Sequence, residues 1–136
     1  MKKFLIASCA VLLLPTAAFA DHDAEMIIAY RYSDLAFRAP TIDLVHMHLH
    51  QVVNCLVGPG GPGFDATYTN PCAEAGNGAI PDAPESSMEF QMRIVLATVN
   101  AGLAATDIAT AKKYAGDASA TINSGQCALA TGVHYG

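Results

Sequence analysis

Three histidines alternate along one short stretch, His46-Met47-His48-Leu49-His50, in a chain that contains only five histidines. Imidazole is the most common protein ligand for metal ions and the side chain that titrates near neutral pH. The cluster therefore indicates a protein that binds a metal ion, with the three histidines as the first candidate ligands. Met47 adds a thioether, which is a soft ligand that suits copper.

The spacing of the histidines decides which of them can share one ion. In a helix each residue turns by about 100°, so His46 and His50 lie on the same side, about one turn apart. Pairs with this spacing chelate a single ion in zinc-binding helices. The same rotation carries His48 to the opposite side. We therefore predict His46 and His50 as the metal pair, with His48 and Met47 available to a second set of ligands.

Further side chains could complete such a site, and their chemistry separates the candidate metals. Met88 and Met92 provide thioethers, whereas Asp43 and Glu89 provide carboxylates. Imidazole with thioether favours copper, and imidazole with carboxylate favours zinc, nickel or cobalt. Copper and zinc are the first candidates. His22 would offer copper an imidazole beside a free amine if the chain were cleaved just before residue 21.

Haem b is an alternative cofactor. Four-helix bundles hold haem between facing helices with His/Met or His/His axial ligands. Met88 or Met92 opposite His46 or His50 would supply such a pair. The chain would then be an electron-transfer bundle rather than a protein that binds a free metal ion.

A third alternative is a secreted structural protein that self-assembles without any metal. Its histidines would be half-exposed side chains on an amphipathic helix, and Tyr30, Tyr32 and Phe37 would form a contact surface. Homo-oligomer formation stays open in every case. An enzyme is not indicated, because the sequence has no G-x-S-x-G, H-E-x-x-H, Walker or dinucleotide-binding motif.

The first twenty residues have the pattern of an export signal. Lys2 and Lys3 precede an apolar run over 4–14, and Ala18-Phe19-Ala20 has the small-x-small pattern of a cleavage site. Cleavage after Ala20 would leave 21–136 as a single domain in the periplasm or outside the cell. The apolar run is too short for a membrane-spanning helix and no later segment is longer, so membrane insertion is not expected.

The charge of the mature chain would be strongly negative. Two of the seven basic residues and none of the twelve acidic residues belong to the leader, so five basic residues remain against twelve acidic ones and the net charge becomes −7. An acidic chain without a basic stripe argues against nucleic acid as a partner. It is compatible with binding cations.

The hydrophobic pattern predicts an all-α, antiparallel bundle of about four helices. Apolar residues recur every three to four positions over 23–38, 42–57, about 85–102 and 106–125. Pro40 and Gly58 delimit the second segment, and Gly125 is the expected end of the fourth. The alanine-rich fourth helix is weakly apolar and is expected at the edge of the bundle. Residues 58–84, rich in Gly and Pro, form an irregular loop between two helical hairpins.

The cysteines indicate one structural disulfide. Cys9 belongs to the leader, which leaves Cys55 at the end of the second helix, Cys72 in the loop, and Cys127. We favour Cys55–Cys72, which would fasten the loop to the bundle, although three cysteines allow two other pairings. Cys127 would then be a buried thiol, an intermolecular disulfide partner or a metal ligand. The sequence has no CxxC and no CxxCH, so it lacks the motifs of a thioredoxin-like centre and a c-type haem.

Overall fold

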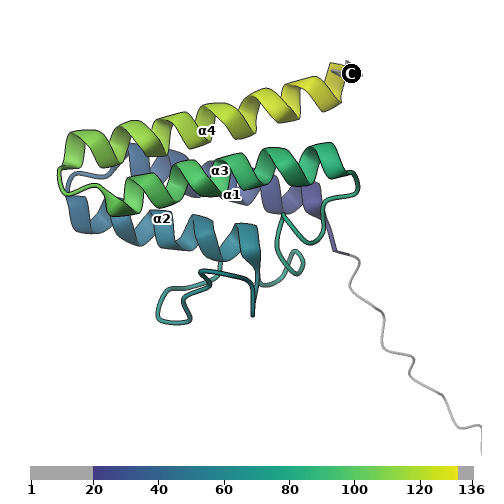
Figure 1. Cartoon of the computed structure of the whole chain (residues 1–136), viewed down its shortest axis with the longest axis horizontal. Helices are drawn as coiled ribbons and strands as arrows, with labels where there is room; N and C mark the ends of the chain where they lie inside the picture. The colour runs from purple at the N-terminus through teal and green to yellow at the C-terminus, as the bar shows by residue number, and fades with distance from the viewer. Residues whose placement is uncertain (1–19, 132–136) are drawn as a thin grey trace, which may run out of the picture.

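Four helices make up the regular structure of the described chain: α1 (His22–Arg38), α2 (Ile42–Val57), α3 (Ser86–Ala104) and α4 (Ile108–Thr131). The structure is a computed structural model that describes residues 20–131, with side chains as far as residue 125. Figure 1 shows the helices lying along the long axis, with the α1–α2 and α3–α4 turns at the same end. The predicted all-α bundle of two hairpins is confirmed, whereas the predicted leader, apart from Ala20, lies outside the described residues.

Short polar side chains and glycine set the helix ends. The Oδ1 atom of Asp21 accepts a hydrogen bond from the backbone N–H of Ala24 (3.0 Å), and Thr41 Oγ1 accepts one from the N–H of Leu44 (3.3 Å). Both side chains thus satisfy N–H groups that a helix start leaves without a partner. Gly58 ends α2 with a φ of 68°, a conformation that glycine adopts at little cost. These signals place α2 at the residues that the sequence predicts.

The core forms where the apolar stripes of the helices meet. Val45, Leu49 and Val52 of α2 are completely buried, as are Val95 and Val99 of α3. α2 packs against both α1 and α3, so its apolar stripe lies near the centre of the bundle. The remaining buried core residues of the other helices are Met26, Ala29 and Ala36 of α1, Met92 of α3, and Ala111, Ala115, Ala118 and Ile122 of α4.

The expectation that α4 lies at the bundle edge is wrong. α4 packs against α1 and α3 and also reaches α2, and its Ala111, Ala115 and Ala118 are completely buried. A stripe of alanines buries little apolar area per residue, which makes its sequence signal weak. The same small side chains let neighbouring helices approach closely, so α4 completes the bundle through close contact between helices rather than through large side chains.

Gly125 does not end α4, which continues to Thr131. Gly125 is buried, and a Cβ atom added to it would lie 2.9 Å from Cδ of Gln91 in α3. The Gln91 amide donates a hydrogen bond to the Thr121 carbonyl (3.2 Å), which keeps this side chain against α4. The glycine therefore marks a close approach of two helices, and glycine inside a helix often has such a packing role.

The segment between α2 and α3 contains turns and bends but no helix or strand. Its residues 79 and 80 run beside the end of α2, where the N–H groups of Ala79 and Ile80 donate to the carbonyls of Cys55 and Leu56 (3.1 and 2.9 Å). The Sγ atoms of Cys55 and Cys72 lie at disulfide-bonding distance, as predicted. We call residues 58–85 the crossing loop.

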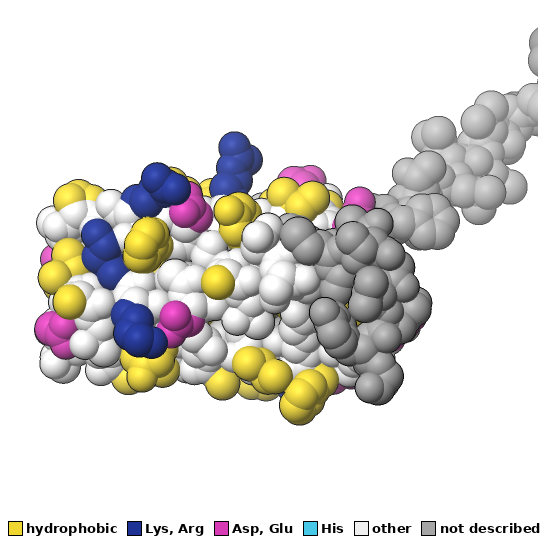
Figure 2. Space-filling view, turned by 90° about the horizontal axis from the view of Figure 1, so that it is seen from above, with side chains coloured by type: hydrophobic (Ala, Val, Ile, Leu, Met, Phe, Trp, Pro, Cys, Tyr) yellow, Lys and Arg dark blue, Asp and Glu magenta, His cyan; other side chains and the backbone are white. Residues whose placement is uncertain are grey.

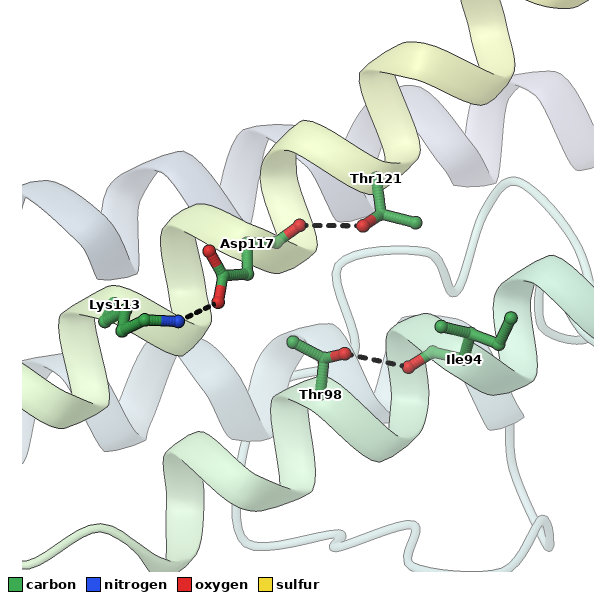
Figure 3. Close-up of polar contacts among 5 residues, drawn as sticks. All are labelled: Ile94, Thr98, Lys113, Asp117 and Thr121. Atoms are coloured by element: carbon green, nitrogen blue, oxygen red, sulfur yellow. Dashed lines mark hydrogen bonds and ion pairs between the residues drawn. The ribbon is translucent and has the colours of Figure 1, made fainter.

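The outer surface of α3 and α4 carries several local polar contacts. Figure 3 shows the ion pair between Lys113 Nζ and Asp117 Oδ2 (2.6 Å) and two threonine hydroxyls that donate to carbonyls one turn earlier, Thr98 to Ile94 (3.0 Å) and Thr121 to Asp117 (2.9 Å). In Figure 2 charged side chains of both signs lie among separate hydrophobic ones. Among the described side chains, no histidine is visible on that face.

None of the helices between residues 20 and 131 combines the length and apolar character that crossing a membrane requires.

Reduction of the Cys55–Cys72 pair should destabilise the bundle. The two cysteines are 17 positions apart, and closing a loop of this length stabilises a fold by about 3 kcal/mol in the chain-entropy estimate. Urea unfolding of a Cys127→Ser protein, with and without dithiothreitol, should show this loss. The double variant Cys55→Ser, Cys72→Ser should be insensitive to the reductant. Equal unfolding free energies in both conditions would contradict a stabilising disulfide.

Candidate functional site

The predicted metal pair lies on α2, beside the buried stripe. His46 and His50 are both half-buried, and the charge of His46 is one of the causes that lower the pKa of His50, so each ring lies within the electric field of the other. The Nε2 atom of His46 is buried and has no hydrogen-bond partner in the protein. A buried ring nitrogen without a partner is costly, so this atom is available to a ligand or a water molecule.

His50 is held by the crossing loop. Its ring stacks on Tyr68, with the two ring centroids 4.1 Å apart and the planes 5° from parallel. Burial lowers the pKa of His50, and His46 lowers it further, whereas the negative charge of Asp65 acts in the opposite direction. Tyr68 and Asp65 both belong to the loop, so the surroundings of His50 depend on how the loop is fastened to α2.

Asn54 provides that attachment, and the sequence analysis missed it. Its side chain is completely buried one turn beyond His50. Asn54 Nδ2 donates to the carbonyls of Asp65 (2.8 Å) and Tyr68 (3.0 Å), and Asn54 Oδ1 accepts from the N–H of Asp65 (2.8 Å). The amide thus satisfies three backbone groups of the loop and sets the position of Tyr68 over His50. In the sequence Asn54 is only a polar residue in a helical stretch, so its partners could not be inferred.

His48 points elsewhere. Its Nδ1 atom lies 2.9 Å from Oε1 of Gln51, and its ring meets that of Tyr32 in α1 edge-on, with centroids 6.1 Å apart. The expected separation of His48 from the His46/His50 pair therefore agrees with these contacts. Met47 is half-buried. The side chain of Cys127 lies outside the described part of the structure.

The spare ligands named from the sequence have other surroundings. Met92 is completely buried in the core, and Met88 is half-buried. Glu89 pairs with Arg93 one turn later in α3 (2.7 Å) and lines a cleft of about 470 Å³ between the crossing loop and α3. Asp43 is exposed in the first turn of α2. Within the described residues, no three His, Cys, Asp or Glu side chains gather as a group able to hold a metal ion.

A second cluster of polar groups lies at the opposite end of α1 from its hairpin turn, and it centres on Glu25. The Glu25 side chain is completely buried; Oε1 accepts a hydrogen bond from the N–H of Gly78 in the crossing loop (2.7 Å), and Oε2 has no partner. The sulfurs of Cys55 and Cys72 lie 3.4 and 3.7 Å from the Glu25 carbonyl oxygen. The residue therefore joins α1, the disulfide and the loop.

Gly78 permits this arrangement because of its backbone. Its φ is 121°, and a Cβ atom there would lie 2.6 Å from the backbone nitrogen of Gly58 at the end of α2. A larger residue would force the loop away from α2 and withdraw the N–H that Glu25 accepts.

Burial is the main cause that raises the pKa of Glu25, from 4.5 to about 7. The hydrogen bond from Gly78 opposes this shift, while the negative charges of Asp82 and Asp21 add to it. His22, one turn before Glu25, is only 6% exposed, and neither of its ring nitrogens has a partner. In the sequence, an acidic residue in the first turn of a helix suggests only a favourable interaction with the helix dipole. The burial of Glu25 is a tertiary property.

No protein-family model matches the chain, and no curated protein or solved structure is significantly similar to it.

Replacing Glu25 by glutamine tests the pH dependence of stability. Between pH 4.5 and about 7 the folded chain retains a proton that the unfolded chain has released. The contribution of Glu25 to stability is therefore complete below pH 4.5 and is lost as the pH rises through about 7. Glu25→Gln should remove this loss and raise the unfolding free energy at slightly alkaline pH by roughly 1–3 kcal/mol, as measured by urea unfolding across the pH range.

The control is Glu74→Gln, which removes a carboxylate from an exposed position of the crossing loop. Its unfolding free energy should follow the pH dependence of the unmodified protein. If both variants show the same dependence, the titrating group is not Glu25.

Proposed function

We propose that the protein is an exported metal-binding protein that holds a copper or zinc ion through His46 and His50. The observation that carries this proposal is the buried Nε2 atom of His46, which has no partner in the protein and lies on the same side of α2 as His50. Neutral imidazole is a good ligand for either metal. The role would be sequestration, delivery or sensing of the ion rather than turnover.

The surroundings of the pair support binding at this place on α2. The rings are half-buried, so a bound ion would be partly shielded from solvent, and Asp65 lies close enough to His50 to affect its pKa. Asp65 Oδ1 already accepts hydrogen bonds from Thr67 N and Oγ1 (2.9 and 2.6 Å). The described residues hold no third His, Cys, Asp or Glu grouped with the pair, so the two imidazoles would be the protein ligands, and water or a partner molecule would complete the coordination.

The export part of the proposal depends on the leader pattern in residues 1–20 and on the acidic composition of the rest of the chain. A predicted mature charge of −7 is compatible with attracting cations. The haem b and self-assembly hypotheses stay predictions. Tyr30 and Tyr32, two of the residues suggested as an assembly surface, pack against the core.

Metal titration of untagged protein is the direct test. With Cu²⁺ or Zn²⁺ followed by calorimetry, His46→Ala and His50→Ala should each weaken binding by at least about 10-fold, because each removes a ligand of a two-imidazole site. His48→Ala is the matched control: it removes the same kind of side chain from the same helix on a different side. Its affinity should be unchanged.

Tyrosine emission gives a second measurement, because the chain has no tryptophan. Cu²⁺ bound at His50 should quench the emission of Tyr68, which stacks on that ring. Tyr68→Phe should lose this part of the quenching and retain the calorimetric affinity. Unchanged metal affinity in the double variant His46→Ala, His50→Ala would reject the proposed site, whatever happens to the emission.

A further inference from the structure

The N-terminal end of α1 borders a cavity that is separate from the α2 histidine pair. Its volume is about 330 Å³, and its walls come from the start of α1 and from the crossing loop. The lining residues are Ala20, Asp21, His22, Asp23, Asp82 and Pro84. In Figure 1 this end of α1 lies opposite the two hairpin turns.

The imidazole of His22 lies in the wall of this cavity without any hydrogen-bond partner. Only 6% of the residue is exposed. Both ring nitrogens are buried, and neither has a hydrogen-bond partner among the residues that line the cavity or elsewhere in the described chain. The neighbouring carboxylates make other bonds: Asp21 Oδ1 accepts from Ala24, and Asp82 accepts from the backbone and side-chain nitrogens of Asn77. Burying an imidazole without hydrogen-bond partners is costly, so a bound molecule that supplies such partners would stabilise the ring in this position.

The charge around His22 selects a cation. Three of the lining residues are aspartates, none is Lys or Arg, and the buried Glu25 carboxyl lies one helical turn further on. The start of α1 adds the equivalent of only about half a positive charge. Three carboxylates outweigh this, so the potential in the cavity is negative.

The arrangement of the acceptors distinguishes between kinds of cation. Copper and zinc favour imidazole ligands, and this cavity has only one imidazole, whereas its carboxylates come from separate places on α1 and the crossing loop. An ammonium group has three N–H donors that point in different directions and can reach acceptors spread around a cavity. We propose that this cavity binds a primary ammonium group, with a ring nitrogen of His22 and the carboxylates of Asp23 and Asp82 as acceptors.

This ammonium group could come from two sources. One is a free alkylamine, for which 330 Å³ is sufficient space. The other is the chain itself, because cleavage after Ala20 would turn the nitrogen of Asp21 into an α-ammonium group. That nitrogen already donates to the carbonyl of Ala75 in the crossing loop (2.9 Å), so the new charge would form at the wall of the cavity.

Titration of the full, uncleaved chain with 1,4-diaminobutane tests the binding of a free amine. Saturable binding, followed by amide shifts in NMR spectra, should map to residues around the cavity. His22→Leu removes the ring acceptors at similar bulk and should weaken binding by at least about 10-fold. Asp23→Asn should weaken it less, and Asp43→Asn, which removes a carboxylate from the first turn of α2, should leave it unchanged.

Protein recovered after export, with its first residue established by mass spectrometry as Asp21, tests the second source. An α-ammonium group held in the cavity should titrate above the ordinary value of about 7.7–8.0 for this group, and diaminobutane should no longer bind. An ordinary α-amine pKa with diaminobutane binding retained would identify a free amine as the ligand.

The proposal is overturned if the uncleaved chain does not bind diaminobutane and the exported chain has an ordinary α-amine pKa. It is also overturned if ZnCl₂ or CuCl₂ alone binds in a His22-dependent manner while the diamine does not, because the cavity would then be a metal site. Neither result bears on the His46/His50 pair, whose binding is measured with His22 intact.

Discussion

The crossing loop must find partners for its backbone polar groups without forming a helix or a strand, and two buried side chains of the bundle supply several of them. Asn54 of α2 bonds to three backbone groups at residues 65 and 68, and Glu25 of α1 accepts the N–H of Gly78. Unpaired buried backbone groups cost free energy comparable to a lost hydrogen bond. Together with the Cys55–Cys72 pair and the backbone bonds of residues 79 and 80 to α2, these two polar residues hold the loop in position. Both candidate sites lie where these residues hold the loop.

The sequence predicted the helices best where short polar residues and glycine set their ends. Thr41 and Gly58 fix both bounds of α2, because a capping hydroxyl and a positive φ act within one turn of the chain. The prediction for α4 was wrong, because the position of this helix depends on how closely it approaches its neighbours. Alanine and Gly125 have the same local preferences at a bundle edge as in its interior. Only the position of Gln91 and the other helices decides between these cases.

Features of the candidate sites could be predicted where they depend on local helix geometry, and could not where they depend on contacts with the crossing loop. The separation of His48 from His46 and His50 follows from helix rotation alone and agrees with the contacts of His48 to Gln51 and Tyr32. The stacking of Tyr68 on His50 could not be predicted, because it depends on a contact between residues 18 positions apart that Asn54 arranges. The burial of His22 and Glu25 likewise depends on the loop that folds over them.

The attachments divide the crossing loop into short lengths. Asn54 holds residues 65 and 68, the disulfide holds Cys72, and Glu25 holds Gly78, so the unattached stretches between them are only a few residues long. Short stretches between fixed points have little conformational freedom to lose. A ligand at His50 would therefore meet a prearranged Tyr68, and a cation beside His22 would meet a prearranged Asp82.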